Sequence, residues 1–341
     1  MHRSTTLITF EEACKMFTLH KPCRLLSVLV GMALCPAASF GQGSVLPNKP
    51  VRFVVPFSAA GPNDLVGRII APKLSETLGQ NVIVDNRPSA NGVIGSELVA
   101  RAVADGTVLA VGNSGTHAIN ATLYKNPTYD PVRDFAPISE IVSSSLVLVA
   151  NPKVQANTIK ELIAEAKRAP GKLNIAIGGP AGEIAGNMIK LQANIELNNV
   201  PYKGGAPAAM AVASNESQLM PTLYSSVAAL LDSGKVKPIG VTGLRRDPQL
   251  PNVPTLAESG LDGYQLEFWI GIFAPAKMPT ATVQALSREI ARIANLPEVR
   301  ERFVTAGYTV VGSTPEQFAE RVRRDTEKYR KIILETGMQQ L

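Results

Sequence analysis

The sequence predicts an α/β fold in which mostly parallel sheets are flanked by helices. First, short runs rich in β-branched residues alternate with segments whose apolar residues recur at helical spacing. Second, several of these runs end in loops of small residues, as strands do at the ligand-binding edge of such sheets. Third, 341 residues with 45% hydrophobic composition are long enough to bury a large core and usually divide into two domains.

The alternation begins at residue 51 and continues without a repeat or a low-complexity tract. Residues 51–57 (VRFVVPF) form the first expected strand, and the segment after it keeps Leu65, Ile69, Ile70 and Leu74 at helical spacing. This pair is a βα unit. The further strand-like runs are residues 81–86, 107–113, 145–151, 173–179, 218–224 and 236–243, and clear helical patterns are residues 158–169 and 183–194.

Four of the expected strands finish in small-residue loops, at residues 56–64, 112–117, 177–183 and 201–208. Backbone N–H groups at helix N-termini present partial positive charge, so these loops together indicate an anionic ligand held mainly by main chain. Each loop alone has a structural explanation as well. Pro62 and Pro207 suit the first turn of a helix, and a carboxylate such as Asp64 is favourable near a helix start.

The N-terminus has the features of a signal peptide. Lys21 and Arg24 precede the apolar residues 25–38, a stretch shorter than the roughly 20 residues of a membrane span. Ser39 and Gly41 then suit a cleavage site before Gln42. We therefore expect residues 1–41 to direct export to the periplasm and to be removed, with a retained N-terminal anchor as the alternative.

The reactive side chains are concentrated in this segment. Cys14, Cys23 and Cys35 all precede residue 41, and His117 is the one histidine beyond it. Without the segment the chain cannot form a disulfide, a Cys/His zinc site or a Cys–His catalytic pair, so we expect neither a metal nor a cofactor. A formal net charge of +6 is weak for this length, so nucleic acid is not an expected partner.

Enzymatic interpretations find little support. Residues 112–116 (GNSGT) have Thr116 where a nucleophile elbow needs glycine, and His117 follows Ser114 too closely to serve as its base. The glycines of residues 90–95 match neither a dinucleotide fingerprint nor a Walker loop. A hydrolase with a carboxylate pair stays open, because nothing in the sequence selects a pair. We expect a binding protein and not an enzyme.

Several ordered stretches resemble one family of binding proteins. They are residues 49–95, 115–139, 200–208, 236–264 and 268–279, and together they resemble the extracytoplasmic solute-binding receptors of the tripartite tricarboxylate transporter family, the Bug family. The resemblance implies a two-lobed periplasmic binding protein, a Venus flytrap, that is monomeric and closes on a small carboxylate. The ligand classes are di- and tricarboxylates, aromatic acids and amino acids. The partners implied are membrane permease subunits or, alternatively, a sensor kinase.

The resemblance also implies which residues bind the ligand. They are Phe57, Ser58, Ala59, Ala60, Gly61 and Asp64 in the first loop, then Ser114, Thr116 and His117, then Tyr202, Lys203, Gly204, Gly205 and Ala206. The small-residue loop at residues 177–183 adds Gly179 as a candidate, and Tyr224 is a candidate contact for an aromatic ring of the ligand. Two departures from the family pattern matter. Ala60 stands where the family usually has glycine, and residues 218–226 lack a common aspartate, which favours a ligand without an ammonium group.

Two apolar stretches, residues 143–152 and 266–275, are expected to cross between the lobes. One lobe then comprises residues 46–144 and 271–341, and the other comprises residues 145–270. We expect Lys203 to supply positive charge to the ligand. Asp64 either orients a polar ligand group or caps its helix.

Overall fold

The computed structural model describes residues 48–202 and 204–338. The expected signal peptide and Lys203 therefore lie outside the described residues. Within the described ranges no helix is both long enough and apolar enough to span a bilayer. The same ranges contain no group of three or more His, Asp or Glu side chains placed to hold a metal ion.

The first lobe is built on strands in the order β2-β1-β3-β9-β4. β1 pairs in parallel with β2 and β3, as the βα alternation predicts, whereas β9 and β4 pair antiparallel with their neighbours. A short strand, β10, pairs with β4. The strands are β1 (Val51–Val55), β2 (Val82–Asn86), β3 (Val108–Asn113), β4 (Phe135–Ala150), β9 (Glu267–Pro275) and β10 (Thr309–Val310).

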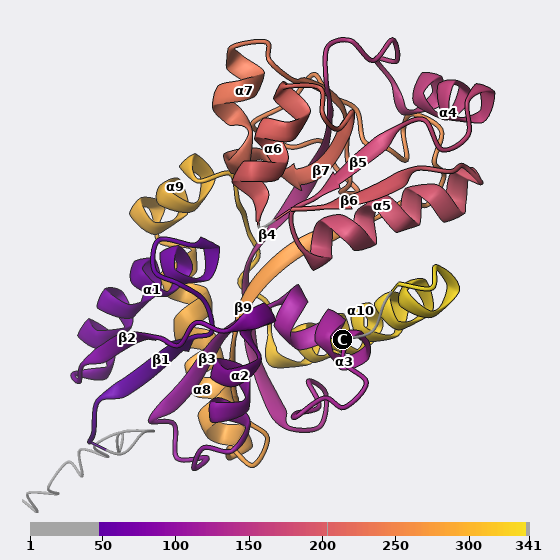
Figure 1. The fold of residues 1–341 in the computed structure, drawn as a ribbon. Helices are drawn as coiled ribbons and strands as arrows, with labels where there is room; N and C mark the ends of the chain where they lie inside the picture. Colours follow the sequence, from indigo (N-terminus) through magenta and orange to yellow (C-terminus); the bar gives the residue numbers. More distant parts are fainter. Residues whose placement is uncertain (1–47, 203, 339–341) are drawn as a thin grey trace, which may run out of the picture. The chain divides into compact units, whose positions relative to one another are not determined.

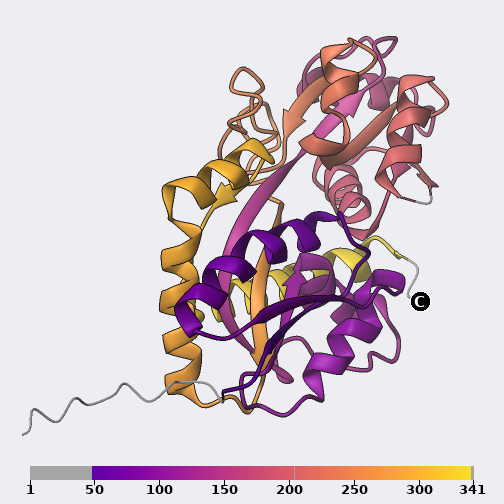
Figure 2. The ribbon, with the colours of Figure 1, turned by 90° about the vertical axis from the view of Figure 1, so that its left-hand side faces the viewer.

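Helices from both ends of the described chain pack in this lobe (Figure 1). They are α1 (Pro62–Leu78), α2 (Val93–Ala100), α3 (Asn120–Leu123), α8 (Thr280–Ala294), α9 (Pro297–Thr305) and α10 (Pro315–Glu335), with the short helical turns η1 (Ala90–Gly92) and η2 (Gly115–Ile119). Figure 2 shows α8 and α9 alongside α1, which they contact. Segments from the N-terminal and C-terminal parts of the described chain thus pack against one another.

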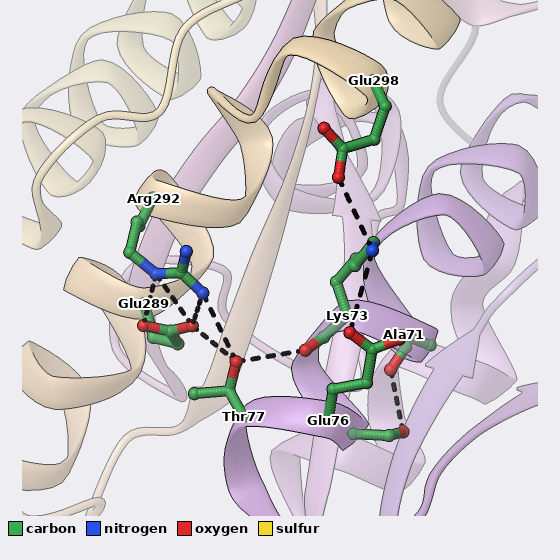
Figure 3. Close-up of polar contacts among 8 residues, drawn as sticks. Ala71, Lys73, Glu76, Thr77, Glu289, Arg292 and Glu298 are labelled. Carbon is green, nitrogen blue, oxygen red and sulfur yellow. Dashed lines mark hydrogen bonds and ion pairs between the residues drawn. The ribbon is translucent and has the colours of Figure 1, made fainter.

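Polar contacts join α1 to α8 and α9 at the surface (Figure 3). The Thr77 hydroxyl donates to Glu289, 2.7 Å away, and Arg292 pairs with the same carboxylate at 2.6 Å. Lys73 lies 3.5 Å from Glu298 of α9. Exposed pairs of this kind contribute about 0–1 kcal/mol each, so the apolar core beneath them holds these helices together.

The second lobe has parallel strands in the order β7-β5-β6, with β7 and β8 antiparallel to β4. The strands are β5 (Asn174–Ile177), β6 (Asn198–Pro201), β7 (Leu219–Leu223) and β8 (Lys237–Val241). The helices are α4 (Ile159–Arg168), α5 (Pro180–Ala193), α6 (Gly205–Ala213) and α7 (Ala228–Asp232), with the turn η3 (Tyr224–Ser226). The prediction of an α/β fold with helix-flanked parallel strands is confirmed.

The antiparallel pairs come from the long crossover strands, β4 and β9 (Figure 1). β4 pairs with β9 as far as Ser145 and with β7 from Leu146 onward. Trp269 and Phe273 of β9 are fully buried, as is Phe318 of α10, which packs against both. We keep residues 145 and 271 as the proposed boundaries between the lobes.

Candidate functional site

A cavity of about 270 Å³, which we call the ligand cavity, is lined by residues of both lobes. It lies at the carboxyl ends of parallel strands, the edge at which α/β sheets bind ligands. The first lobe contributes Phe57, Asn91, Asn113, Gly115 and Asn120. The second contributes Leu146, Gly178, Gly179, Pro180, Ala181, Gly182, Gly205, Met220, Pro221, Thr222, Leu223, Ser226 and Phe268.

The start of α5 opens directly into this cavity. Gly179 precedes the helix, Pro180 occupies its first turn, and no side chain caps it. The N–H groups of Ala181 and Gly182 have no hydrogen-bond partner among the described residues. Because the first N–H groups of a helix lack partners within it, this end offers two donors to an anion.

The start of α6 adjoins that of α5. Gly204 precedes it with φ +109°, a backbone conformation that favours glycine. No side chain caps this helix either, and Gly205 lines the cavity. A Cβ on Gly178 would lie 2.9 Å from the Cα of Gly205, so the two loops touch backbone to backbone. Two uncapped helix N-termini therefore meet at one wall of the ligand cavity.

The start of α1 also has no side-chain cap, but its first turn contains the buried Asp64, which ties the preceding loop to its surroundings. Its carboxylate accepts hydrogen bonds from the Ala60 N–H at 2.9 Å, from Arg68 at 2.8 Å and from Asn86 at 3.0 Å. Burial would raise the pKa of Asp64, but these hydrogen bonds outweigh it and hold the pKa below its usual value. Of the two roles considered for Asp64, the contacts favour the structural one.

Among the other expected residues of the loop between β1 and α1, Phe57 lines the ligand cavity and the rest do not. Ser58, Ala59 and Ala60 are exposed. Ala60 has φ +64°, which is the left-handed conformation that explains why glycine suits this position. Ala59, Ala60, Gly61 and Asp64 instead line a neighbouring open groove with Arg302 and Tyr308.

The loop after β3 reaches the cavity through residues other than those expected. Asn113 and Gly115 line it, whereas Ser114, Thr116 and His117 are buried behind them. The Thr116 N–H donates to the Asn113 side chain at 3.0 Å. The amide of Asn113 donates in turn to Asn63 of α1 at 2.9 Å, so this asparagine ties two loops of the first lobe together.

His117 lies in an aromatic cluster within the first lobe. Its ring stacks on Phe273 with 3.8 Å between centroids and meets the edge of Phe135 at 4.4 Å. Its Nδ1 lies 2.7 Å from the Thr116 hydroxyl, and its Nε2 is buried without a partner among the described residues. Burial lowers the pKa of His117 to about 3, so the ring is neutral at ordinary pH. This placement favours packing over ligand contact.

In the second lobe the structure brings Gly179 and Gly205 to the cavity but not Tyr202 or Tyr224. The Tyr202 hydroxyl donates to Glu216 at 3.0 Å, near the far end of α6. Ala206, one residue beyond Gly205, is exposed. Sequence reasoning missed the residues that β4, β7 and β9 contribute, among them Leu146, Thr222 and Phe268, because a strand interior carries no loop signal.

The ligand cavity is polar at one wall and apolar at another. The described lining contains no charged side chain. Leu146 pairs directly with Leu223 across β4 and β7, and Phe57 and Phe268 extend the apolar surface. A ligand of matching chemistry has an anionic end for the α5 and α6 amides and an uncharged body for this surface.

Comparison with known proteins agrees with this architecture. The family described as "Tripartite tricarboxylate transporter family receptor" matches residues 66–338. The periplasmic binding protein BugD is 34% identical and superimposes with a TM-score of 0.71, covering 85% of this chain and 98% of its own.

Two further solved structures contain carboxylates. An R. palustris protein with adipate is 30% identical with a TM-score of 0.75, covering 85% of this chain and 98% of its own. MatC from Rhodopseudomonas palustris, with bound malate, is 29% identical with a TM-score of 0.72, covering 84% and 100%. The family consists of solute-binding receptors and not of enzymes, which confirms that expectation. The chain belongs to the tripartite tricarboxylate transporter family of receptors, which includes the Bug proteins.

Proposed function

We propose that this protein binds a small carboxylate in the ligand cavity, with the carboxylate group at the joined N-termini of α5 and α6. The observation that carries the proposal is that these two uncapped helix starts line one cavity whose described residues bear no charge. Main-chain N–H groups and helix dipoles stabilise an anion in such a position without a cationic side chain.

The lining also limits the rest of the ligand. A ligand ammonium group would lose water without meeting an acidic partner in the described lining, which is unfavourable. Leu146, Leu223 and Phe268 favour a hydrocarbon body in its place. The proposed ligand is therefore a carboxylate without an amino group, either an aliphatic dicarboxylate or an aromatic acid, and the relatives solved with adipate and malate support the first choice.

The family description supports a role in transport. We propose that residues 1–41 are a cleaved signal peptide, that the mature protein works in the periplasm, and that it delivers its ligand to the membrane subunits of a transporter. Lys203 precedes Gly204 in the sequence, and we propose that it adds positive charge near the carboxylate. Changing Lys203 to Ala should then weaken binding and reduce its dependence on salt.

A thermal-shift screen followed by calorimetry tests the ligand assignment. The panel contains adipate, malate, succinate and benzoate, together with 2-aminoadipate and aspartate as matched compounds that carry an ammonium group. We expect at least one carboxylate to raise the melting temperature saturably and adipate to bind at least ten-fold more tightly than 2-aminoadipate. A panel without any binder would overturn the carboxylate proposal. Tighter binding of the amino acids would overturn the proposal that the ligand lacks an amino group.

A further inference from the structure

A second cavity, which we call the arginine cavity, lies beside the crossover strands. Its volume is about 370 Å³, and it shares no described lining residue with the ligand cavity. On β4, Ser143, Ser144 and Ser145 line the arginine cavity and Leu146 lines the ligand cavity. On β9, Glu267 lines the arginine cavity and Phe268 lines the ligand cavity. The two cavities are therefore separate sites.

Four arginines line this cavity, and two of them have strong acidic partners. Arg321 of α10, whose side chain is 14% exposed, binds Glu267 at 2.9 Å and Asp325 at 2.8 Å. Arg246, in the loop after β8, lies 3.1 Å from Glu258. These two guanidinium groups are already neutralised within the protein.

The other two arginines are not neutralised in this way. Arg245 makes no ion pair and no side-chain hydrogen bond within the described parts of the chain. Arg324 has one ion-pair contact there, to Asp325 at 3.5 Å. That carboxylate already accepts hydrogen bonds from Arg321 and from the Trp269 ring N–H, both at 2.8 Å. Arg245 thus brings to the cavity a guanidinium group without an acidic partner among the described residues, and Arg324 brings one whose single ion-pair contact is long.

The other polar groups of the lining are compatible with an anion. Ser143 and Ser145 place hydroxyl groups, which can donate hydrogen bonds, along the β4 wall. The acid Asp247 accepts a hydrogen bond from the Gln249 N–H at 2.8 Å and is only 5% exposed. Burial raises the pKa of Asp247.

We propose that the arginine cavity is a second binding site, for a small oxyanion of the phosphate or sulfate type held between Arg245 and Arg324. Guanidinium groups bind such oxygens through paired N–H donors. Arg245 lies in the loop after β8 of the second lobe and Arg324 lies on α10, so a bound anion links these elements. The proposal does not depend on the ligand of the other cavity.

The test measures anion binding to the whole protein by calorimetry and by thermal shift. Sodium phosphate and sodium sulfate are titrated in separate arms, each against sodium chloride at matched ionic strength. The variants are Arg245→Ala, which removes no ion pair or side-chain hydrogen bond of the described residues, and the double variant Arg245→Ala with Arg324→Ala. Arg323→Ala is the matched control, because Arg323 is an exposed arginine of α10 that pairs with Glu320 and does not line the cavity.

We expect saturable binding of at least one of the two anions to the unmodified protein and to Arg323→Ala. Arg245→Ala should weaken the apparent affinity at least five-fold, and the double variant at least ten-fold. The proposal is overturned if neither anion binds saturably beyond the chloride control, or if Arg245→Ala and the double variant keep the affinity of the unmodified protein.

Discussion

The N-terminus of α1 and the adjoining N-termini of α5 and α6 show two different surroundings of an uncapped helix start. All three follow loops of small residues and carry proline in the first turn or close to it. At α1, Asp64 takes hydrogen bonds from Ala60, Arg68 and Asn86. At α5 and α6 no side chain takes this role. None of the three helices has a side-chain cap, so α1 differs in the buried carboxylate that holds the loop before it.

The largest expected effect is at Gly178, where the two open helix starts meet. Gly178→Ala places a Cβ 2.9 Å from the backbone of Gly205, so one loop must move. Overpacking of this kind costs about 1–3 kcal/mol of stability, and it should weaken carboxylate binding at least ten-fold. Calorimetry and urea unfolding measure the two effects.

Gly179→Ala is the matched control for this change, because a Cβ there meets no atom within 4 Å. Its free energy of unfolding should stay close to that of the unmodified protein. If Gly178→Ala binds the ligand normally, the contact between the α5 and α6 loops is not needed to hold the carboxylate.

Asp64→Asn tests the role of Asp64 in holding the loop before α1. The substitution removes a buried charge that accepts three hydrogen bonds, so it should lower the free energy of unfolding by about 1–3 kcal/mol while ligand affinity changes less than three-fold. Because the pKa of Asp64 is lowered in the folded protein, its contribution is present above the usual value of 3.8 and is lost as the pH falls through the folded pKa. Urea unfolding between pH 7 and pH 3 should show the two proteins converging. A large loss of affinity at pH 7 would instead make Asp64 a ligand contact.

A substitution of His117 tests the loop after β3. Gly115 of this loop lines the ligand cavity, whereas its neighbours are buried. The His117 pKa of about 3 in the folded protein lies below the unfolded value of about 6.5. The unfolded chain therefore binds a proton first, and stability should fall as the pH drops below 6.5, by about 2 kcal/mol at pH 5.

His117→Phe should remove this part of the pH dependence and leave ligand affinity within three-fold. Urea unfolding of both proteins at pH 7 and pH 5, paired with calorimetry at pH 7, makes the comparison. A ten-fold loss of affinity would show that His117 contacts the ligand. An unchanged pH dependence would show that burial does not keep the ring neutral.

The smallest effect belongs to Ala60, whose φ of +64° is strained for a residue with a side chain. Ala60→Gly should raise the free energy of unfolding by up to about 1 kcal/mol, because the relief of this strain is partly offset by the greater entropy of glycine in the unfolded chain. Binding should change little, since the residue does not line the ligand cavity. A markedly altered affinity would indicate that this loop closes on the ligand.

Local sequence patterns predicted the βα units well, because β1, β2, β3, β5, β7 and β8 all lie within expected runs. They did not predict the first half of β4. Residues 139–145 of that strand include Glu140, whose buried carboxyl has its pKa raised to about 7 by burial, against the opposing charge of Arg321. Local patterns could not predict this polar run as part of a strand, because the charge that acts on Glu140 belongs to Arg321, far along the chain.

The candidate site could be predicted only in outline for the same reason. The small-residue loops pointed to main-chain binding, but the contacts of Asp64 with Arg68 and Asn86, and the meeting of the α5 and α6 starts at one cavity, arise only in the fold. The apolar wall formed by Leu146, Leu223 and Phe268 likewise depends on strand pairing between distant segments.

The most direct test of the central claim is an amide ¹H–¹⁵N NMR titration of the protein with the carboxylate that gives the largest thermal shift. A carboxylate held at the joined helix starts should cause the largest downfield amide proton shifts at Ala181, Gly182, Gly205 and Ala206, with smaller changes at Ala60 and Asn63. The largest shifts at Ala60 and Asn63, with little change at the α5 and α6 amides, would contradict the claim.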